Sequence, residues 1–269
     1  MTKIIGTDHP VYKSKWKNLK QERFNGAYYY AKEIERNIIP KIDTDRNWVL
    51  LNVRPFAFNH SIIFIHNNMY PFIYDWLGST GFRDLVLVCG VPETCEKVKH
   101  IGRTIYLPLS VDVKEVEQYK TRKTRGAAFV GRQPKRNGIT FPSDTDFIEG
   151  LPRQELLQEM AKYKTVYAVG RTAIEAKILG CDIKPYDPRF PDPSIWKVVD
   201  NSEAAAMLQE RLNEIDGQTV CDYGRRLLQP LRQTKGFNGS RWRNYSRSDN
   251  SSSEECRDKS GRYSHYGNR

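Results

Sequence analysis

The sequence lacks long hydrophobic runs and has little cysteine. No apolar stretch approaches the roughly 20 residues that a transmembrane helix needs, and the chain does not open on the basic-then-apolar pattern of a signal peptide. The five cysteines are scattered and form no Cys-x-x-Cys pair, which argues against a disulfide framework and against a zinc site. These absences predict a cytoplasmic, intracellular protein with no membrane span and no bound metal.

Two further absences concern catalysis. Residues 1–24 contain no glycine-rich strand–turn–helix of the dinucleotide-binding kind. No pair of carboxylates stands out at two strand ends, which argues against enzymes that hydrolyse or phosphorolyse glycosides.

What the chain has in excess is positive charge. The formal net charge is +11, of which the segment from Lys235 onward carries +4, with eight Lys or Arg against four Asp or Glu. Both portions of the chain are therefore basic, and a polyanionic partner such as DNA or RNA is favoured. A solvated basic surface without a partner would give the same composition.

Short apolar runs alternate with helix-compatible segments, which is typical of parallel sheets covered by helices. The expected strands are residues 48–53, 61–65, 84–90, 103–112, 127–132, 139–141 and 165–169. The expected helices are residues 25–39, 70–77, 92–100, 152–164, 171–180, 202–215 and 223–231. The pattern predicts an α/β fold.

The stretch from Thr165 to Gly180 is organised as strand, tight turn and helix. Gly170 would let a ligand approach the backbone at the helix start, where free N–H groups favour an anion, and Thr172 is a natural cap or phosphate contact. Glu175 follows one turn later, where a carboxylate can accept hydrogen bonds from a ribose. A glycine for close packing and a glutamate that complements the helix dipole explain the same residues, so both interpretations stay open.

Two other strand ends carry candidate site residues. Gly131 and Arg132 end an apolar run, and Lys135 follows three residues later, so a guanidinium and an ammonium could surround a diphosphate. His66 follows another apolar run and is the candidate general base, since an imidazole titrates near neutral pH. The alternatives are a solvated basic loop after Gly131 and a helix cap at His66.

Three motifs follow one another between Ile105 and about Tyr186. They are Leu107-Pro108-Leu109-Ser110-Val111-Asp112, Val130-Gly131-Arg132 with Lys135, and Thr172-Ala173-Ile174-Glu175-Ala176-Lys177-Ile178-Leu179-Gly180. In this order and spacing they resemble the donor-binding, carboxyl-terminal half of glycosyltransferases with two Rossmann-like domains, the GT-B architecture. One departure is Tyr167, which stands where many retaining members carry a second glutamate.

The resemblance implies a reduced GT-B-like fold, in which two Rossmann-like parallel-sheet domains face a cleft. Residues 1–112 would form a shortened acceptor-side domain, residues 113–232 the nucleotide-sugar-binding domain, and residues 233–269 a disordered basic tail. The implied donor-binding residues are Gly131, Arg132, Lys135, Gly170, Arg171, Thr172 and Glu175. Within this set Arg132 and Lys135 would bind the diphosphate, Thr172 a phosphate and Glu175 the ribose, with His66 facing the sugar across the cleft.

The expected function is transfer of a sugar from a nucleotide-sugar donor, with no cofactor besides this co-substrate. The basic surface makes a nucleic acid, such as a modified base in DNA, the expected acceptor. The alternative is a non-catalytic nucleic-acid-binding protein that uses a degenerate glycosyltransferase-like fold. Arginines alternate with Trp242 and Tyr245 in the tail, which fits nucleic-acid binding and equally an idle solubilising segment.

Overall fold

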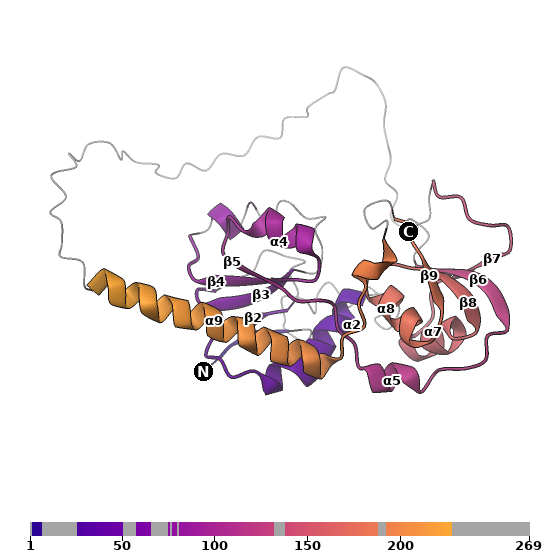
Figure 1. The fold of residues 1–269 in the computed structure, drawn as a ribbon, viewed down its shortest axis with the longest axis horizontal. Coiled ribbons are helices and arrows are strands. Elements are labelled where there is room, and N and C mark those ends of the chain that lie inside the picture. Colours follow the sequence, from indigo (N-terminus) through magenta and orange to yellow (C-terminus); the bar gives the residue numbers. More distant parts are fainter. Residues whose placement is uncertain are drawn as a thin grey trace, which may run out of the picture. The chain divides into compact units, whose positions relative to one another are not determined.

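The computed structural model describes residues 2–6, 26–50, 58–65, 75, 77–79, 81–131, 138–187 and 192–227. Within these residues the chain is an α/β protein with two parallel sheets and helices packed against each (Figure 1). Both sheets belong to one unit, Met1–Gly224. No helix in this part of the chain is long and apolar enough to cross a membrane. The structure thus confirms the α/β class with Rossmann-like parallel sheets.

The first sheet has the strand order β1-β2-β3-β4-β5, which is also the order along the chain. Its strands are β1 (Ile4–Ile5), β2 (Asn47–Val49), β3 (Ser61–Ile65), β4 (Leu85–Cys89) and β5 (Arg103–Tyr106). Every residue of β3 and β4 is buried, because these strands lie inside a parallel sheet covered on both faces. This burial is why both strands are continuous apolar runs in the sequence.

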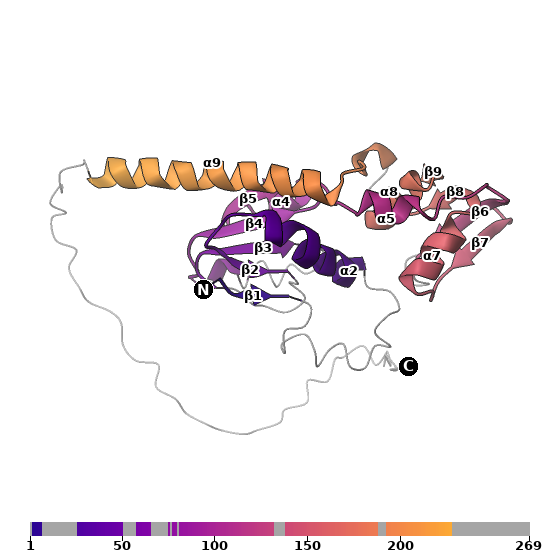
Figure 2. The same ribbon diagram turned by 90° about the horizontal axis from the view of Figure 1, so that it is seen from below.

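The helices of the first core come from both ends of the chain (Figure 2). They are α2 (Gly26–Glu33), which continues into the π-helical turn η1 (Ile34–Ile38) and the 3-10 turn η2 (Ile39–Lys41), then α4 (Pro92–Val98) and α9 (Asn201–Leu227). Ala204, Leu208 and Leu212 of α9 are fully or almost fully buried and belong to the first core. Helix α9 therefore packs in the same core as the first sheet, whose strand β1 lies near the start of the chain.

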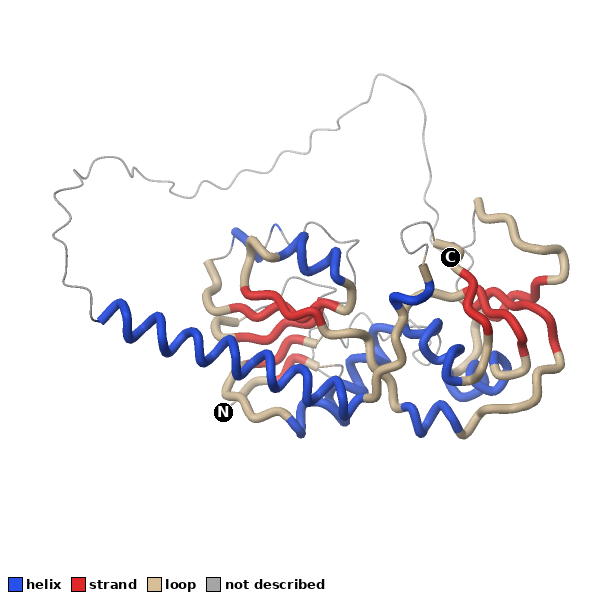
Figure 3. Tube along the Cα trace, viewed as in Figure 1, coloured by secondary structure: helices blue, strands red, loops and turns tan. Residues whose placement is uncertain are grey.

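The second sheet, whose strands are red at the right of Figure 3, has the order β7-β6-β8-β9, again with all strands parallel. Its strands are β6 (Arg125–Val130), β7 (Thr145–Ile148), β8 (Tyr163–Tyr167) and β9 (Asp182–Lys184). Its helices are α5 (Val113–Glu117), α7 (Arg153–Met160) and α8 (Arg171–Ile178), and the 3-10 turn η3 (Pro193–Ile195) precedes α9. Leu157, Met160 and Ile174 of α7 and α8 are buried in the second core.

Three sequence expectations about these elements were wrong. Residues 139–141 form no strand, and the strand of this region begins at Thr145 after a turn in which the Thr145 N–H donates to the carbonyl of Pro142 at 3.0 Å. Strand β8 begins at Tyr163, two residues before the expected start. The helix expected to end at residue 215 continues through Gly217 to Leu227 as one element, because Gly217 keeps the helical conformation.

Candidate functional site

The order of the strands in the second sheet predicts where on this sheet a ligand would bind. The chain passes from β6 to β7 on one side of β6 and later returns to β8 on the other side. Open α/β sheets bind ligands at the carboxyl ends of the two strands where the order reverses in this way. Here these strands are β6 and β8, with Phe129 opposite Tyr167 in register. Gly131 follows β6, and Gly170 follows β8 after two residues, so both glycines lie at this carboxyl edge of the sheet.

Helix α8 begins at this edge without a side-chain cap. Its N-cap residue, Gly170, has φ 64° and ψ −140°, a backbone conformation that is essentially restricted to glycine. The N–H groups of Ala173 and Ile174 donate to the Gly170 carbonyl at 3.0 and 3.2 Å. The N–H groups of Arg171 and Thr172 precede the first intrahelical bond, and together with the helix dipole they favour an anion.

The side chain of Arg171 is held by Glu33, which ends helix α2 of the first core. Arg171 is 8% exposed, and its Nη2 donates to Glu33 Oε1. Its Nε lies 3.1 Å from Glu175 Oε1. Among the residues that the structure describes, no hydrogen-bond acceptor reaches Arg171 Nη1, although this atom is buried. Arg171 Nη1, which also takes part in no ion pair among the described residues, is therefore a buried donor at the first residue of α8.

Glu175 is only 3% exposed and is paired with arginines. Its Oε1 accepts a hydrogen bond from Arg153 Nη1 at 2.5 Å, and Arg153 Nη2 lies 3.4 Å from Glu33 Oε1. Burial opposes the charge on Arg153, but the carboxylates of Glu175 and Glu33 outweigh it and raise the pKa of Arg153. Asn201 completes the group by donating to Glu33 Oε2 at 3.1 Å. The Glu33 cluster is defined as Glu33, Arg153, Arg171, Glu175 and Asn201.

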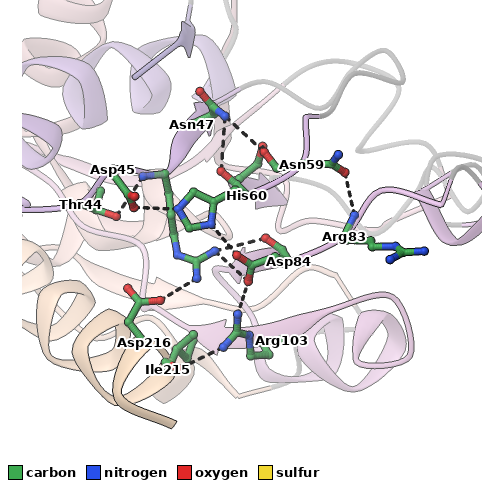
Figure 4. Close-up of polar contacts among 12 residues, drawn as sticks. Thr44, Asp45, Asn47, Asn59, His60, Arg83, Asp84, Arg103, Ile215 and Asp216 are labelled. Carbon is green, nitrogen blue, oxygen red and sulfur yellow. Dashed lines mark hydrogen bonds and ion pairs between the residues drawn. The ribbon is translucent and has the colours of Figure 1, made fainter. Parts of the chain in front are cut away.

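A second polar group lies at the amino edge of the first sheet, at the opposite end of its strands from the edge where such folds bind ligands (Figure 4). His60 precedes β3 and Asp84 precedes β4, and both have left-handed backbones, with φ of 56° and 57°. His60 Nδ1 lies 2.5 Å from Asp84 Oδ2, and His60 Nε2 lies 2.7 Å from Asp45 Oδ1. Partial burial opposes the imidazolium, but the hydrogen bonds to Asp45 and Asp84 outweigh it and raise the pKa of His60.

Two arginines connect this group to helix α9 (Figure 4). Arg46 Nη1 lies 3.1 Å from Asp84 Oδ1, and Arg46 Nη2 donates to Asp216 Oδ1 at 2.6 Å. Arg103 pairs with Asp84 and donates to the carbonyl of Ile215 at 3.0 Å. The group serves to fasten α9 to the sheet. The His60 cluster is defined as Asp45, Arg46, His60, Asp84, Arg103 and Asp216.

Sequence reasoning did not find the His60 cluster. The signal was a polar residue directly before each buried run, His60 before Ser61 and Asp84 before Leu85. Because Ser61 and Leu85 are partners in parallel strands, the two preceding residues must also be neighbours. Likewise, nothing in the sequence pointed to Glu33 or Arg153 as partners of the predicted site residues.

The structure brings four predicted residues together at the start of α8, and Gly131 lies at the end of a neighbouring strand. The four are Gly170, Arg171, Thr172 and Glu175. His66, Arg132 and Lys135 lie outside the described residues. In the part of the chain that the structure describes, no group of three or more His, Cys, Asp or Glu side chains could hold a metal ion. A scan against protein-family models and a search of curated proteins found no match to the chain.

Proposed function

We propose that the protein is a glycosyltransferase that takes a sugar from a nucleotide-sugar donor. The observation that carries this proposal is the reversal of strand order between β6 and β8, where Gly131 and the uncapped start of α8 lie. A donor diphosphate at this edge would accept hydrogen bonds from the N–H groups of Arg171 and Thr172. Gly170 has no side chain, so the phosphate can approach the backbone closely.

In the proposed reaction the bond between the anomeric carbon and the diphosphate oxygen breaks, and the anomeric carbon bonds to an acceptor oxygen. Negative charge develops on the departing nucleoside diphosphate, and the start of α8 would stabilise it together with Arg132 and Lys135. His66 would take the proton from the acceptor as general base. The roles of Arg132, Lys135 and His66 are carried by the sequence motifs, since these residues lie outside the described part.

Glu175 supports a ribose contact through one of its two oxygens. Arg153 and Arg171 both bind Oε1, whereas no hydrogen bond or ion pair from another described residue reaches Oε2. A ribose hydroxyl would donate to Oε2 while the two guanidinium groups hold the carboxylate in place. In this proposal Arg153 is a positioning residue, because it would act on the donor only through Glu175.

Isothermal titration calorimetry with UDP, GDP and UDP-glucose tests the donor site. We expect one nucleotide to bind, and we expect Arg132→Ala and Thr172→Val each to weaken its binding by about tenfold, since each removes a charge-assisted hydrogen bond to phosphate. The control is Arg122→Ala, which removes an exposed arginine in the connection before β6 and should leave affinity unchanged. The proposal fails if no nucleotide binds, or if all three variants bind as the parent does.

The net charge of +11 favours a second candidate, a nucleic-acid-binding protein that uses this fold without chemistry. Its signature would be DNA or RNA binding that weakens steeply with salt, without binding of any nucleotide in the calorimetric panel. Release of free nucleoside diphosphate from the donor when DNA is added would instead support the transferase.

A further inference from the structure

A hollow of about 470 Å³ lies between helix α2 and the start of helix α7. Small-molecule sites in proteins commonly enclose about 300–1,000 Å³. The lining residues are Tyr28, Tyr29 and Lys32 from α2, and Pro152, Arg153, Gln154 and Glu155 from the start of α7. Neither the donor motifs nor the Glu33 cluster accounts for the residues that α2 contributes here.

The α2 side of the hollow combines aromatic rings with positive charge. The rings of Tyr28 and Tyr29 meet edge to face, with centroids 5.8 Å apart and planes at 76°. Lys32 Nζ lies 4.7 Å from the centroid of Tyr28, and the Arg153 guanidinium lies 6.0 Å from the centroid of Tyr29. Rings of this kind attract a planar group, and the ammonium of Lys32 attracts an anion, while the charge of Arg153 is paired with carboxylates of the Glu33 cluster.

The α7 side offers hydrogen-bond donors and acceptors. Pro152 is the N-cap residue and provides no side-chain cap, while the Leu156 N–H makes the first intrahelical bond to the Pro152 carbonyl at 2.8 Å. The N–H groups of the three residues between them therefore have no partner within the helix, which favours a phosphate. The exposed side chains of Gln154 and Glu155 can donate to and accept from the edge of a heterocyclic base.

We propose that this hollow binds one nucleoside monophosphate unit. The base lies against Tyr28 and Tyr29, and the phosphate lies between Lys32 and the start of α7. A sugar alone would not use the ammonium, and an inorganic anion would not use the rings. The unit can be a free nucleotide or an unpaired nucleotide of a nucleic-acid strand, since both present the same base and phosphate.

The hollow and the proposed donor position at α8 share Arg153, which lines the hollow and binds Glu175. If the protein is the proposed transferase, the unit in the hollow is the acceptor, and this assignment alone rests on the proposed function. The proposal that the hollow binds a nucleotide does not depend on the proposed transferase function.

The test measures binding of the full chain to a fluorescein-labelled single-stranded DNA of ten nucleotides by fluorescence anisotropy. We expect Tyr29→Leu to weaken binding by about tenfold, the scale of losing one base stack. We expect Lys32→Glu to weaken it by about tenfold as well, because an anion would then face the phosphate. Lys97→Glu is the matched control, because it makes the same charge change at an exposed lysine on α4 and should alter affinity less than twofold. Circular dichroism confirms that each variant is folded.

Competition with unlabelled AMP, GMP, CMP and TMP shows whether the hollow binds a free nucleotide or a nucleotide within a strand. If a mononucleotide displaces the strand, the hollow takes a free nucleotide. If no mononucleotide does so while Lys32→Glu and Tyr29→Leu still weaken strand binding, the hollow takes a nucleotide within a strand. The proposal is overturned if both variants bind the strand as tightly as Lys97→Glu. Failure of the donor site would appear separately, as the absence of an Arg132→Ala effect in the calorimetric panel.

Discussion

The Glu33 cluster and the His60 cluster both pair arginines with carboxylates, but the members of the His60 cluster are more exposed, apart from Arg46, whose side chain is 1% exposed. Arg171 and Glu175 of the first are 8% and 3% exposed, whereas the His60 and Asp45 side chains of the second are 40% and 89% exposed. A charge withdrawn from water depends strongly on its partners, while an exposed charge can be solvated when a partner is lost. Removing a partner from the Glu33 cluster should therefore lower the free energy of unfolding strongly. Removing a partner from the His60 cluster should lower the free energy of unfolding by less, and the contribution of this cluster to stability should depend on pH.

The largest effect is expected from Glu33→Gln. Glu33 contacts Arg171, Arg153 and Asn201, so its neutralisation leaves two buried guanidinium groups with Glu175 as their main carboxylate. We expect the free energy of unfolding to fall by about 3 kcal/mol, the cost of removing one partner of a buried ion pair. Urea unfolding monitored by circular dichroism measures this change.

The control for that change is Glu115→Gln, which weakens a more distant contact to the same arginine. Glu115 Oε1 lies 3.7 Å from Arg153 Nε, and its side chain is 38% exposed. Its loss should cost at most about 1 kcal/mol. Equal effects of the two variants would mean that burial does not distinguish the contacts.

A smaller effect is expected from Asp84→Asn in the His60 cluster. Asparagine tolerates the left-handed backbone at this position, so the substitution removes the charge without adding backbone strain. Arg46, Arg103 and His60 lose a shared carboxylate that is itself 33% exposed, and we expect a loss of about 1–2 kcal/mol. The same unfolding measurement applies, with Asp45→Asn as the control. A loss as large as that of Glu33→Gln would contradict the comparison.

The smallest expected effect is the change with pH in the stability that His60 contributes. Because the pKa of His60 is raised above 6.5 in the folded protein, its stabilising contribution is complete below pH 6.5 and is lost as the pH rises through the folded value. The parent should therefore lose up to about 1 kcal/mol more stability between pH 6 and pH 9 than His60→Asn, which tolerates the same backbone and does not titrate. Parallel unfolding curves at the two pH values decide this, and identical losses would show that His60 does not respond.

The contribution of the carboxylates of the same cluster to stability depends on pH in the opposite direction. Hydrogen bonds and charge from His60 and Arg46 hold the pKa of Asp84 below 3.8 despite partial burial, and the hydrogen bond from His60 lowers the pKa of Asp45. These carboxylates stabilise the fold above pH 3.8, and the contribution is lost as the pH falls through their folded values.

Much of the second sheet could be predicted because its signals are local. The apolar runs at β6 and β8 end in Gly131 and Gly170, and both strands and the helix after Gly170 are present in the structure. Strand β7 was missed because its four residues, Thr145 to Ile148, begin with two polar ones and form no apolar run, whereas the more apolar residues 139–141 before it have no regular secondary structure. Local pattern thus predicted buried strands well and an edge strand poorly.

The partners of the site residues could not be predicted, because they are distant in sequence. Arg171 and Glu33 are 138 positions apart, and no periodicity in either segment indicates that they meet. The order of the four strands in the second sheet is equally non-local, and the ligand edge follows from that order. The sequence predicted candidate ligands at Glu175 and Arg171, but their shared ion pairs are visible only once the two cores are assembled.

The bond between Arg171 and Glu33 makes the start of α8 responsive to events elsewhere in the chain. An anion that accepts a hydrogen bond from the remaining Nη1 of Arg171 would draw on the same guanidinium that holds the last residue of α2. The affinity of the site and the strength of the Glu33 contact are then two terms of one thermodynamic cycle, and each must change the other by the same free energy. Ligand binding at the second sheet would then change the contact that Arg171 makes with the first core.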